Sequence, residues 1–228
     1  MNQTFKIPKT TLVNKPVPKT AFYKHLEMNA RLKVRFVDDI DRIVWLAKLT
    51  PSTLNIEDGK TVHEITIFLV TLKRENVTDD VFIAIDRQMP RHVLFILQFE
   101  ESYCLLLNYK EWADPVKGTF RIIKSFRTDW TDGESLRLDI DGSNMDRLYV
   151  LFVAQVSGFN IHNVADIKLI IDLQQQLVQK QRAVEALQKK VRAERQFNRQ
   201  MELNTEARTL KKEVAALQEK IGCLMRCE

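Results

Sequence analysis

Apolar residues recur at helical spacing through the last quarter of the chain. The first stripe advances by three- and four-residue steps or multiples of them, through Ile170, Leu173, Leu177, Val184, Leu187 and Val191. After a break, a second stripe does the same through Leu203, Leu210, Val214, Leu217, Ile221 and Leu224. Such a stripe is typical of a coiled coil and is unfavourable in water unless another helix covers it. The pattern predicts that residues 166–228 form a helical tail that associates with another copy, a partner or its own second helix.

The two stripes differ in register by two residues, and the change falls near residues 198–204. A local unwinding of one continuous helix would explain this shift, and so would a hinge that folds the tail into a helical hairpin. We take the continuous helix as the prediction and keep the hairpin as the alternative. A continuous helix would be roughly 87 Å long at 1.5 Å per residue.

Shorter apolar runs upstream of the tail predict the strands of a sheet. The run at 62–72 is apolar on both faces, which is typical of a strand inside a sheet. Two further runs, 93–99 and 103–109, are separated by a turn of hairpin length. The run at 81–85 fits either the end of a helix or a strand. The other expected strands are 43–49, 119–126 and a short edge strand at 134–140.

Two helices are expected in the same part of the chain. Thr20 is a typical N-cap for a helix over 21–32, and Ser143 for a helix that Gly158 would end. The fold class predicted is therefore α+β (or α/β), with a mixed sheet of about five strands and flanking helices, followed by a long C-terminal coiled-coil helix. We divide the chain into an extended, proline-containing basic arm at 1–19, a body at 20–165 and the tail at 166–228.

Charge is unevenly distributed between these parts. Residues 1–35 carry a net charge of +7, residues 36–165 a net −6 and residues 166–228 a net +4. A basic arm could contact nucleic acid. The alternative, which the mixed charges of the tail favour, is a solvated surface with the arm lying on the acidic body. The arm residues that nucleic-acid contact would use are Lys6, Lys9, Lys15, Lys19 and Lys24.

Composition and motifs give little sign of catalysis. Six glycines leave little room for a nucleotide-binding loop, and the four histidines are far apart. Cys223 and Cys227 are four residues apart and could hold zinc between two parallel chains, but two unpaired thiols are the simpler interpretation. Arg87, Arg91 and His92 surround a proline and could form an anion-binding edge, although a solvated loop explains them more simply. We expect no cofactor, no metal and, since neither a signal peptide nor a membrane span is indicated, a cytoplasmic protein.

A restriction-type nuclease site is the one catalytic alternative. Such a site places two acidic groups and a lysine at the ends of neighbouring strands, where they hold a divalent metal and polarise water. Asp86, Glu100 and Lys110 could take these roles. Glu100 falls in a predicted hairpin turn, however, and Asn108 stands where an acidic residue would precede the lysine by two positions.

Several segments of the body form a combined pattern that resembles a known family. They are PKTAFY at 18–23, IDRIVWLAKLTP at 40–51, TLNI at 53–56, IDRQMP at 85–90, LF at 94–95 and NYKE at 108–111. Together they resemble a bacterial family of domains of unknown function, over about residues 5–160. Its members tend to be encoded beside Swi/Snf-type helicases and DNA methyltransferases, in clusters that resemble restriction or anti-phage systems. The resemblance brings no catalytic residue with it.

The function predicted is a non-catalytic accessory subunit of a bacterial DNA-processing complex for restriction or anti-phage defence. Its tail would form a homo-oligomer or bind a helicase or a DNA methyltransferase, and its arm would make weak contact with DNA; no membrane contact is expected. The alternatives are the metal-dependent nuclease and a stand-alone structural scaffold. The scaffold predicts no salt-dependent DNA binding, whereas the accessory subunit predicts weak and strongly salt-sensitive binding.

Overall fold

A computed structural model describes residues 5–25, 29–114 and 119–225 of the chain. The chain divides into two compact units, Met1–Gly158 and Phe159–Glu228. Gly158 ends the last helix of the first unit in the left-handed conformation, with φ of 71°. A residue without a Cβ atom adopts this conformation at little cost, so the predicted helix stop at this glycine is confirmed.

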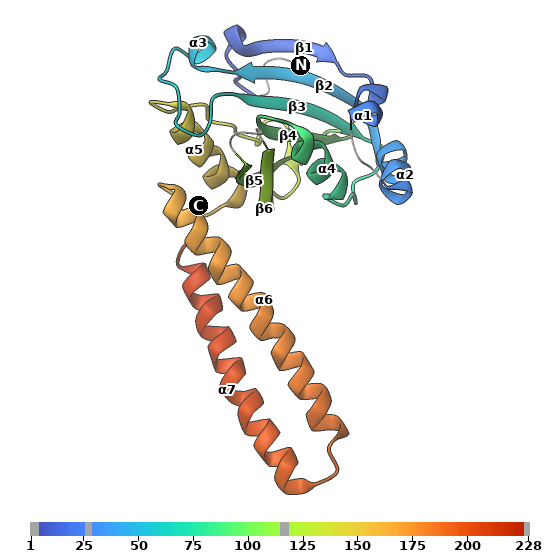
Figure 1. Ribbon diagram of the computed structural model, residues 1–228, viewed down its shortest axis with the longest axis vertical. Helices are drawn as coiled ribbons and strands as arrows, with labels where there is room; N and C mark the ends of the chain where they lie inside the picture. The colour runs from blue at the N-terminus through green and yellow to red at the C-terminus, as the bar shows by residue number, and fades with distance from the viewer. Residues whose placement is uncertain (1–4, 26–28, 115–118, 226–228) are drawn as a thin grey trace. The chain divides into compact units, whose positions relative to one another are not determined.

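The first unit is built on a mixed sheet whose main strands lie in chain order (Figure 1). Neighbouring strands are antiparallel except for one central pair, β3 and β4, which are parallel. A parallel pair needs a crossover connection, and helix α4 provides it. The strands are β1 (Leu12–Pro16), β2 (Ile40–Leu49), β3 (Ile65–Leu72), β4 (His92–Phe99), β5 (Ser102–Asp114), β6 (Thr119–Arg127) and the short β7 (Thr131–Asp132), which pairs with the start of β5.

Helices cover both faces of this sheet. The ring of Phe82 on α4 lies 5.4 Å from that of Phe95 on β4, within a core that also includes Phe36 of α2. His92 lies three positions before Phe95 on the same strand, so it points to the opposite face, where its ring is 4.3 Å from Tyr149 of α5. The helical segments of this unit are η1 (Lys9–Thr11), α1 (Lys19–His25), α2 (Ala30–Asp39), α3 (Pro51–Leu54), α4 (Asp80–Gln88) and α5 (Met145–Ser157).

The structure confirms most of the predicted sheet and changes its edges. The runs at 62–72, 93–99, 103–109 and 119–126 each contain a strand, and the described part of the chain holds seven strands instead of about five. The predicted edge strand at 134–140 is wrong. The carboxylate of Asp132 accepts hydrogen bonds from the backbone N–H groups of Glu134 and Ser135, at 2.8 and 2.7 Å, and these bonds turn the chain away from the sheet.

The N-terminal segments also differ from their predictions. Within the expected arm, β1 pairs with β2 and is an edge strand of the sheet. The expected helix at 21–32 corresponds to α1 and to the start of α2; residues 26–28 lie outside the described residues. The apolar run at 81–85 belongs to α4. Asn144, not Ser143, caps α5, by accepting a hydrogen bond from the backbone of Arg147.

The second unit is a helical hairpin, so the predicted continuous helix is wrong. Its helices are α6 (Val164–Ala193) and α7 (Phe197–Gly222), which lie side by side (Figure 1). Helix α6 begins with a capping box formed by Asn163 and Asp166, and it ends where Glu194 adopts an extended backbone. Folding the tail back covers each apolar stripe with the other, whereas a lone continuous helix would leave both in water.

Candidate functional site

The hairpin contains all the residues predicted to mediate oligomerisation. Ile170 and Leu173 are buried, and the other predicted positions on both helices are half-buried, whereas most neighbouring positions are exposed. This periodic burial indicates that the two stripes face each other within one chain. The half-buried positions are Leu177, Val184, Leu187, Val191, Leu210, Val214, Leu217, Ile221 and Leu224.

Polar contacts hold the two helices of the hairpin in register. Lys180 of α6 forms an ion pair with Glu213 of α7. Near the turn, the side chain of Gln200 donates a hydrogen bond of 3.1 Å to the carbonyl of Val191. At the other end, the backbone N–H of Asn160 donates to the carbonyl of Leu224 at 2.8 Å. The hairpin is therefore tied at both ends and in the middle.

The hairpin also exposes apolar side chains outside the stripes. Phe197 and Met201 are four positions apart on the first turns of α7, beside the turn between the helices. They are 70% and 53% exposed. Residues four apart on a helix lie on one face, so the pair forms a small apolar patch at this end of the hairpin.

A buried ion pair occupies the position of the predicted nuclease site in the first unit. Lys110 of β5 and Asp86 of α4 have fully buried side chains, and the Lys110 Nζ lies 2.6 Å from the Asp86 Oδ1. The same Nζ atom lies 2.5 Å from the carbonyl oxygen of Arg91 and 3.2 to 3.3 Å from those of Asp86 and Met89. An ammonium group, which has three N–H donors and no acceptor, is the form that fits four oxygen partners.

Burial and mutual attraction act in opposite directions on this pair. Burial raises the pKa of the Asp86 carboxyl, against the opposing charge and hydrogen bond of Lys110. Burial likewise lowers the pKa of the Lys110 ammonium, against the attraction of Asp86. The Nζ atom also lies 4.6 Å from the centre of the Phe120 ring, a cation–π contact.

The position of the pair indicates what it does for the fold. Asp86 and Met89 lie at the C-terminal end of α4, where the Met89 N–H donates to the Asp86 carbonyl at 3.2 Å and the Met89 carbonyl lies beyond the helix. The Lys110 ammonium satisfies these carbonyls and binds the turn that leads into β4. A cation at a helix C-terminus also interacts favourably with the helix dipole. The pair therefore attaches the C-terminal end of α4 to strand β5.

Glu100, the third predicted nuclease residue, does not join this pair. It lies in the turn between β4 and β5 with φ of 51°. Lys110 is eight residues beyond the start of β5 at Ser102, which is roughly 27 Å at 3.4 Å per residue. The structure thus brings Asp86 and Lys110 together, leaves Glu100 at the opposite end of the strand and gives the pair no exposed surface.

Other buried polar groups near the pair were not identified as a group from the sequence. Asn108 is buried, and its side-chain oxygen accepts a hydrogen bond of 2.5 Å from the Ser125 hydroxyl. The Tyr149 hydroxyl donates to the backbone carbonyl of Asn108 at 3.2 Å. Burial, followed by the charge of Lys110, lowers the pKa of His92 to about 3, so this histidine is neutral at physiological pH. In the sequence, the alternation of polar and apolar residues at the end of β5 is the signal that could have indicated these buried polar groups.

The lysines predicted to contact nucleic acid do not act as one set. Lys9 lies in η1, before β1, whereas Lys19 begins α1, after β1. The Lys19 ammonium donates to the carbonyl of Ile40, and burial lowers its pKa. Lys6 and Lys15 are exposed, and the side chain of Lys24 lies outside the described residues.

The described residues hold no group of three histidine, cysteine or acidic side chains that could bind a metal ion. Cys104 is buried and Cys223 is exposed, and both are free thiols. Cys227, the second residue of the zinc alternative, lies outside the described residues. None of the described helices is long and apolar enough to cross a membrane.

One comparison with known proteins gives a result. A family model described as a domain of unknown function (DUF4391) matches residues 5–214. No curated protein and no solved structure matches the chain. The matched region extends through α6 and into α7, beyond the limit near residue 160 expected from the sequence. Most of the hairpin is therefore part of the sequence that the family shares.

Proposed function

The chain belongs to the DUF4391 family of domains of unknown function, and we propose that it acts as a non-catalytic accessory subunit whose helical hairpin mediates association. The context proposed is a bacterial DNA-processing complex for restriction or anti-phage defence. The resemblance of the body to a family encoded beside helicases and DNA methyltransferases supports this context.

The incomplete burial of the hairpin stripes is the observation that carries the association. Each helix of a two-helix hairpin covers only one side of the stripe on the other helix. Leu187 and Leu217, for example, remain half-buried, although they lie on the sides of the helices that face each other. A further pair of helices would remove this remaining apolar surface from water, at about 25 cal/mol per Å².

A second copy of the chain is the occupant that we test first. Two identical hairpins can pack about a two-fold axis as a four-helix bundle, because the same surface then serves both partners. Basic Lys180 and acidic Glu213 pair within one hairpin, so these two charges do not oppose a second copy. A helicase or a DNA methyltransferase would then bind the assembled subunit.

The geometry favours this proposal over the nuclease, and DNA binding distinguishes it from the scaffold. A nuclease built on Asp86 and Lys110 would need the pair exposed to substrate and metal, and in this structure both side chains are fully buried. A stand-alone scaffold shares the hairpin but does not bind DNA. The two proposals therefore differ in salt-dependent DNA binding, which is expected of the accessory subunit and not of the scaffold.

The mass of the purified full-length chain in solution tests the association. Light scattering should give twice the monomer mass of 26.7 kDa. Leu187→Gln should shift the protein toward the monomer because it places an amide in the apolar seam. Ala186→Gln, an exposed position next to it on α6, should leave the dimer unchanged.

Helix content must be compared in the same samples, by circular dichroism, so that loss of the hairpin is not mistaken for loss of the dimer. A monomeric wild-type chain at all concentrations would contradict self-association. The partner is tested by recovering the tagged full chain from its host: a co-purifying helicase or methyltransferase, lost with Leu187→Gln and kept with Ala186→Gln, supports the complex.

A further inference from the structure

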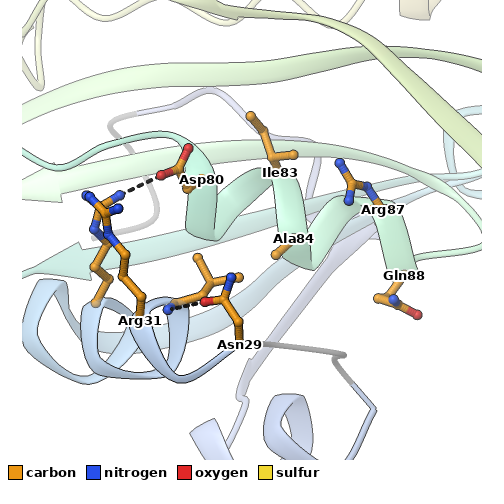
Figure 2. A pocket seen from close by; sticks show the side chains of 9 residues that line it. Asn29, Arg31, Asp80, Ile83, Ala84, Arg87 and Gln88 are labelled. Atoms are coloured by element: carbon orange, nitrogen blue, oxygen red, sulfur yellow. Dashed lines mark hydrogen bonds and ion pairs between the residues drawn. The ribbon is translucent and has the colours of Figure 1, made fainter.

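A polar pocket lies between α2 and α4 on the first unit, with a volume of about 470 Å³ (Figure 2). Asn29, the N-cap of α2, and Arg31 of that helix line one side, and α4 contributes Arg87 and Gln88. The remaining lining residues include Arg35 and Asp80. The volume lies within the range of small-molecule binding sites.

The pocket results from the way each helix divides its faces. Phe36 of α2 and Phe82 of α4 point into the core. Positions three, four and seven residues apart lie together on a helix surface, so Asp80, Ile83 and Arg87 share a second face of α4. Arg31 and Arg35 likewise share one face of α2. These two faces line the pocket.

The pocket holds more positive than negative charge. Arg35 is held in place by Asp80, at 2.5 Å, and by the Thr78 hydroxyl, at 2.8 Å. Arg31 and Arg87 are exposed, and neither side chain forms an ion pair or hydrogen bond with a residue that the structure describes. The three arginines and one aspartate therefore leave a local charge of +2, although the body as a whole is acidic.

We propose that this pocket binds a phosphate ester. The planar guanidinium group donates two parallel hydrogen bonds to phosphate oxygens, and it remains charged at all physiological pH values. A phosphate monoester carries about −1.5 to −2 at pH 7, which balances the pocket, whereas a single carboxylate carries only −1. Apolar Leu32, Ile83 and Ala84 add wall surface for a sugar or base.

The phosphate could belong to a free nucleotide or to a nucleic-acid strand. A strand carries one negative charge per phosphate, so two neighbouring phosphates would balance the local charge of +2, whereas a free nucleotide would do so with one monoester group. The inference deepens the DNA contact in the proposed function and rests on that part of it alone.

Fluorescence anisotropy of the full chain tests this site, with a labelled single strand, a labelled duplex and a labelled adenosine monophosphate as probes. At low salt, Arg31→Gln/Arg87→Gln should weaken the affinity at least tenfold for whichever probe the wild-type chain binds. It should also reduce the slope of log K against log salt by about 1 to 2, because two phosphate contacts are lost.

The matched control is Lys33→Gln/Arg137→Gln, which removes the same charge from exposed positions outside the pocket. It should change affinity less than about threefold. Saturable binding of the monophosphate identifies a free nucleotide as the ligand, and binding of the oligonucleotides alone identifies a strand. Equal losses in both double variants, or no binding of any probe, would overturn the site, whereas the dimer mass would be unaffected by either result.

Discussion

His92 is a residue whose titration should make stability depend on pH between 5 and 8. Its ring is buried between Tyr149, at 4.3 Å, and Phe120, at 5.1 Å. Burial, followed by the charge of Lys110, lowers its pKa to about 3 in the folded chain. In the unfolded chain the pKa is about 6.5. Between pH 3 and pH 6.5, His92 is therefore mostly protonated in the unfolded state and mostly neutral in the folded state.

The contribution of neutral His92 is therefore complete above pH 6.5 and is lost as the pH falls toward 3. Between pH 8 and pH 5 the free energy of unfolding should drop by about 2 kcal/mol from this group. Urea denaturation across this range measures the change, and His92→Phe should remove it. An unchanged pH dependence in the variant would show that other groups are responsible.

Lys110 is the residue that best separates a structural from a catalytic role. Lys110→Met leaves the Asp86 carboxylate buried without its cation, and it leaves the Arg91 carbonyl without its donor. Removing one partner of a buried pair costs about 3 to 5 kcal/mol, and we expect that loss in the free energy of unfolding, measured by urea denaturation.

Replacing both partners should be less harmful than replacing one. Asp86→Asn/Lys110→Met removes the uncompensated charge, so it should recover at least about 1 kcal/mol relative to Lys110→Met. Exposed Lys33→Met should change stability by less than about 0.5 kcal/mol. If Lys110→Met unfolds at the same urea concentration as the wild type, the fastening role is wrong and a functional role for this lysine returns.

At the scale of elements, the sequence predicts those whose pattern is local. The runs that became β3, β4 and β5 are long and apolar, so burial in a sheet is their only stable environment. The edge at 134–140 failed because the Asp132 turn outweighs a weak alternating pattern there. The candidate site residues show the same difference. The hairpin stripes are periodic, so the sequence predicts them. Arg31 and Arg87 line one pocket only because α2 packs beside α4, which the sequence does not reveal.

Asp146 shows why polar contacts between elements were missed. At the start of α5 it resembles a residue that caps its own helix. Instead its carboxylate accepts hydrogen bonds from the backbone N–H groups of Lys60, Thr61 and Val62, at 2.7 to 3.1 Å. Desolvation raises its pKa, but these bonds and one from the Thr61 hydroxyl outweigh it and lower the pKa. Gly59 allows this approach, because a Cβ there would lie 2.6 Å from the Asp146 Oδ1.

The register shift predicts a break in the tail near 198–204, but those residues are helical and the break lies before them. Both an unwound helix and a hinge satisfy a two-residue shift. The hinge forms at 194–196, where Glu194 leaves the helix and its side chain accepts a hydrogen bond of 2.9 Å from the backbone of Gln196. No glycine or proline marks this turn. The free energy of covering both stripes decides the outcome, and that depends on the whole tail.

At the scale of the whole molecule, the two compact units should unfold in separate transitions. The first unit has its own buried core around Phe95 and Leu106, and the second consists of two helices whose stripes are only half-buried. If hairpins associate in pairs, the native hairpin is stabilised by mass action, and its unfolding midpoint must rise with protein concentration. The sheet unit takes no part in this association and should unfold at a constant temperature.

Differential scanning calorimetry of the full chain over a hundredfold range of concentration measures this difference. One transition should move upward with concentration and the other should stay fixed. Leu187→Gln should lower only the moving transition and weaken its concentration dependence, and Ala186→Gln should change neither. Two transitions that are both independent of concentration would contradict self-association of the hairpin.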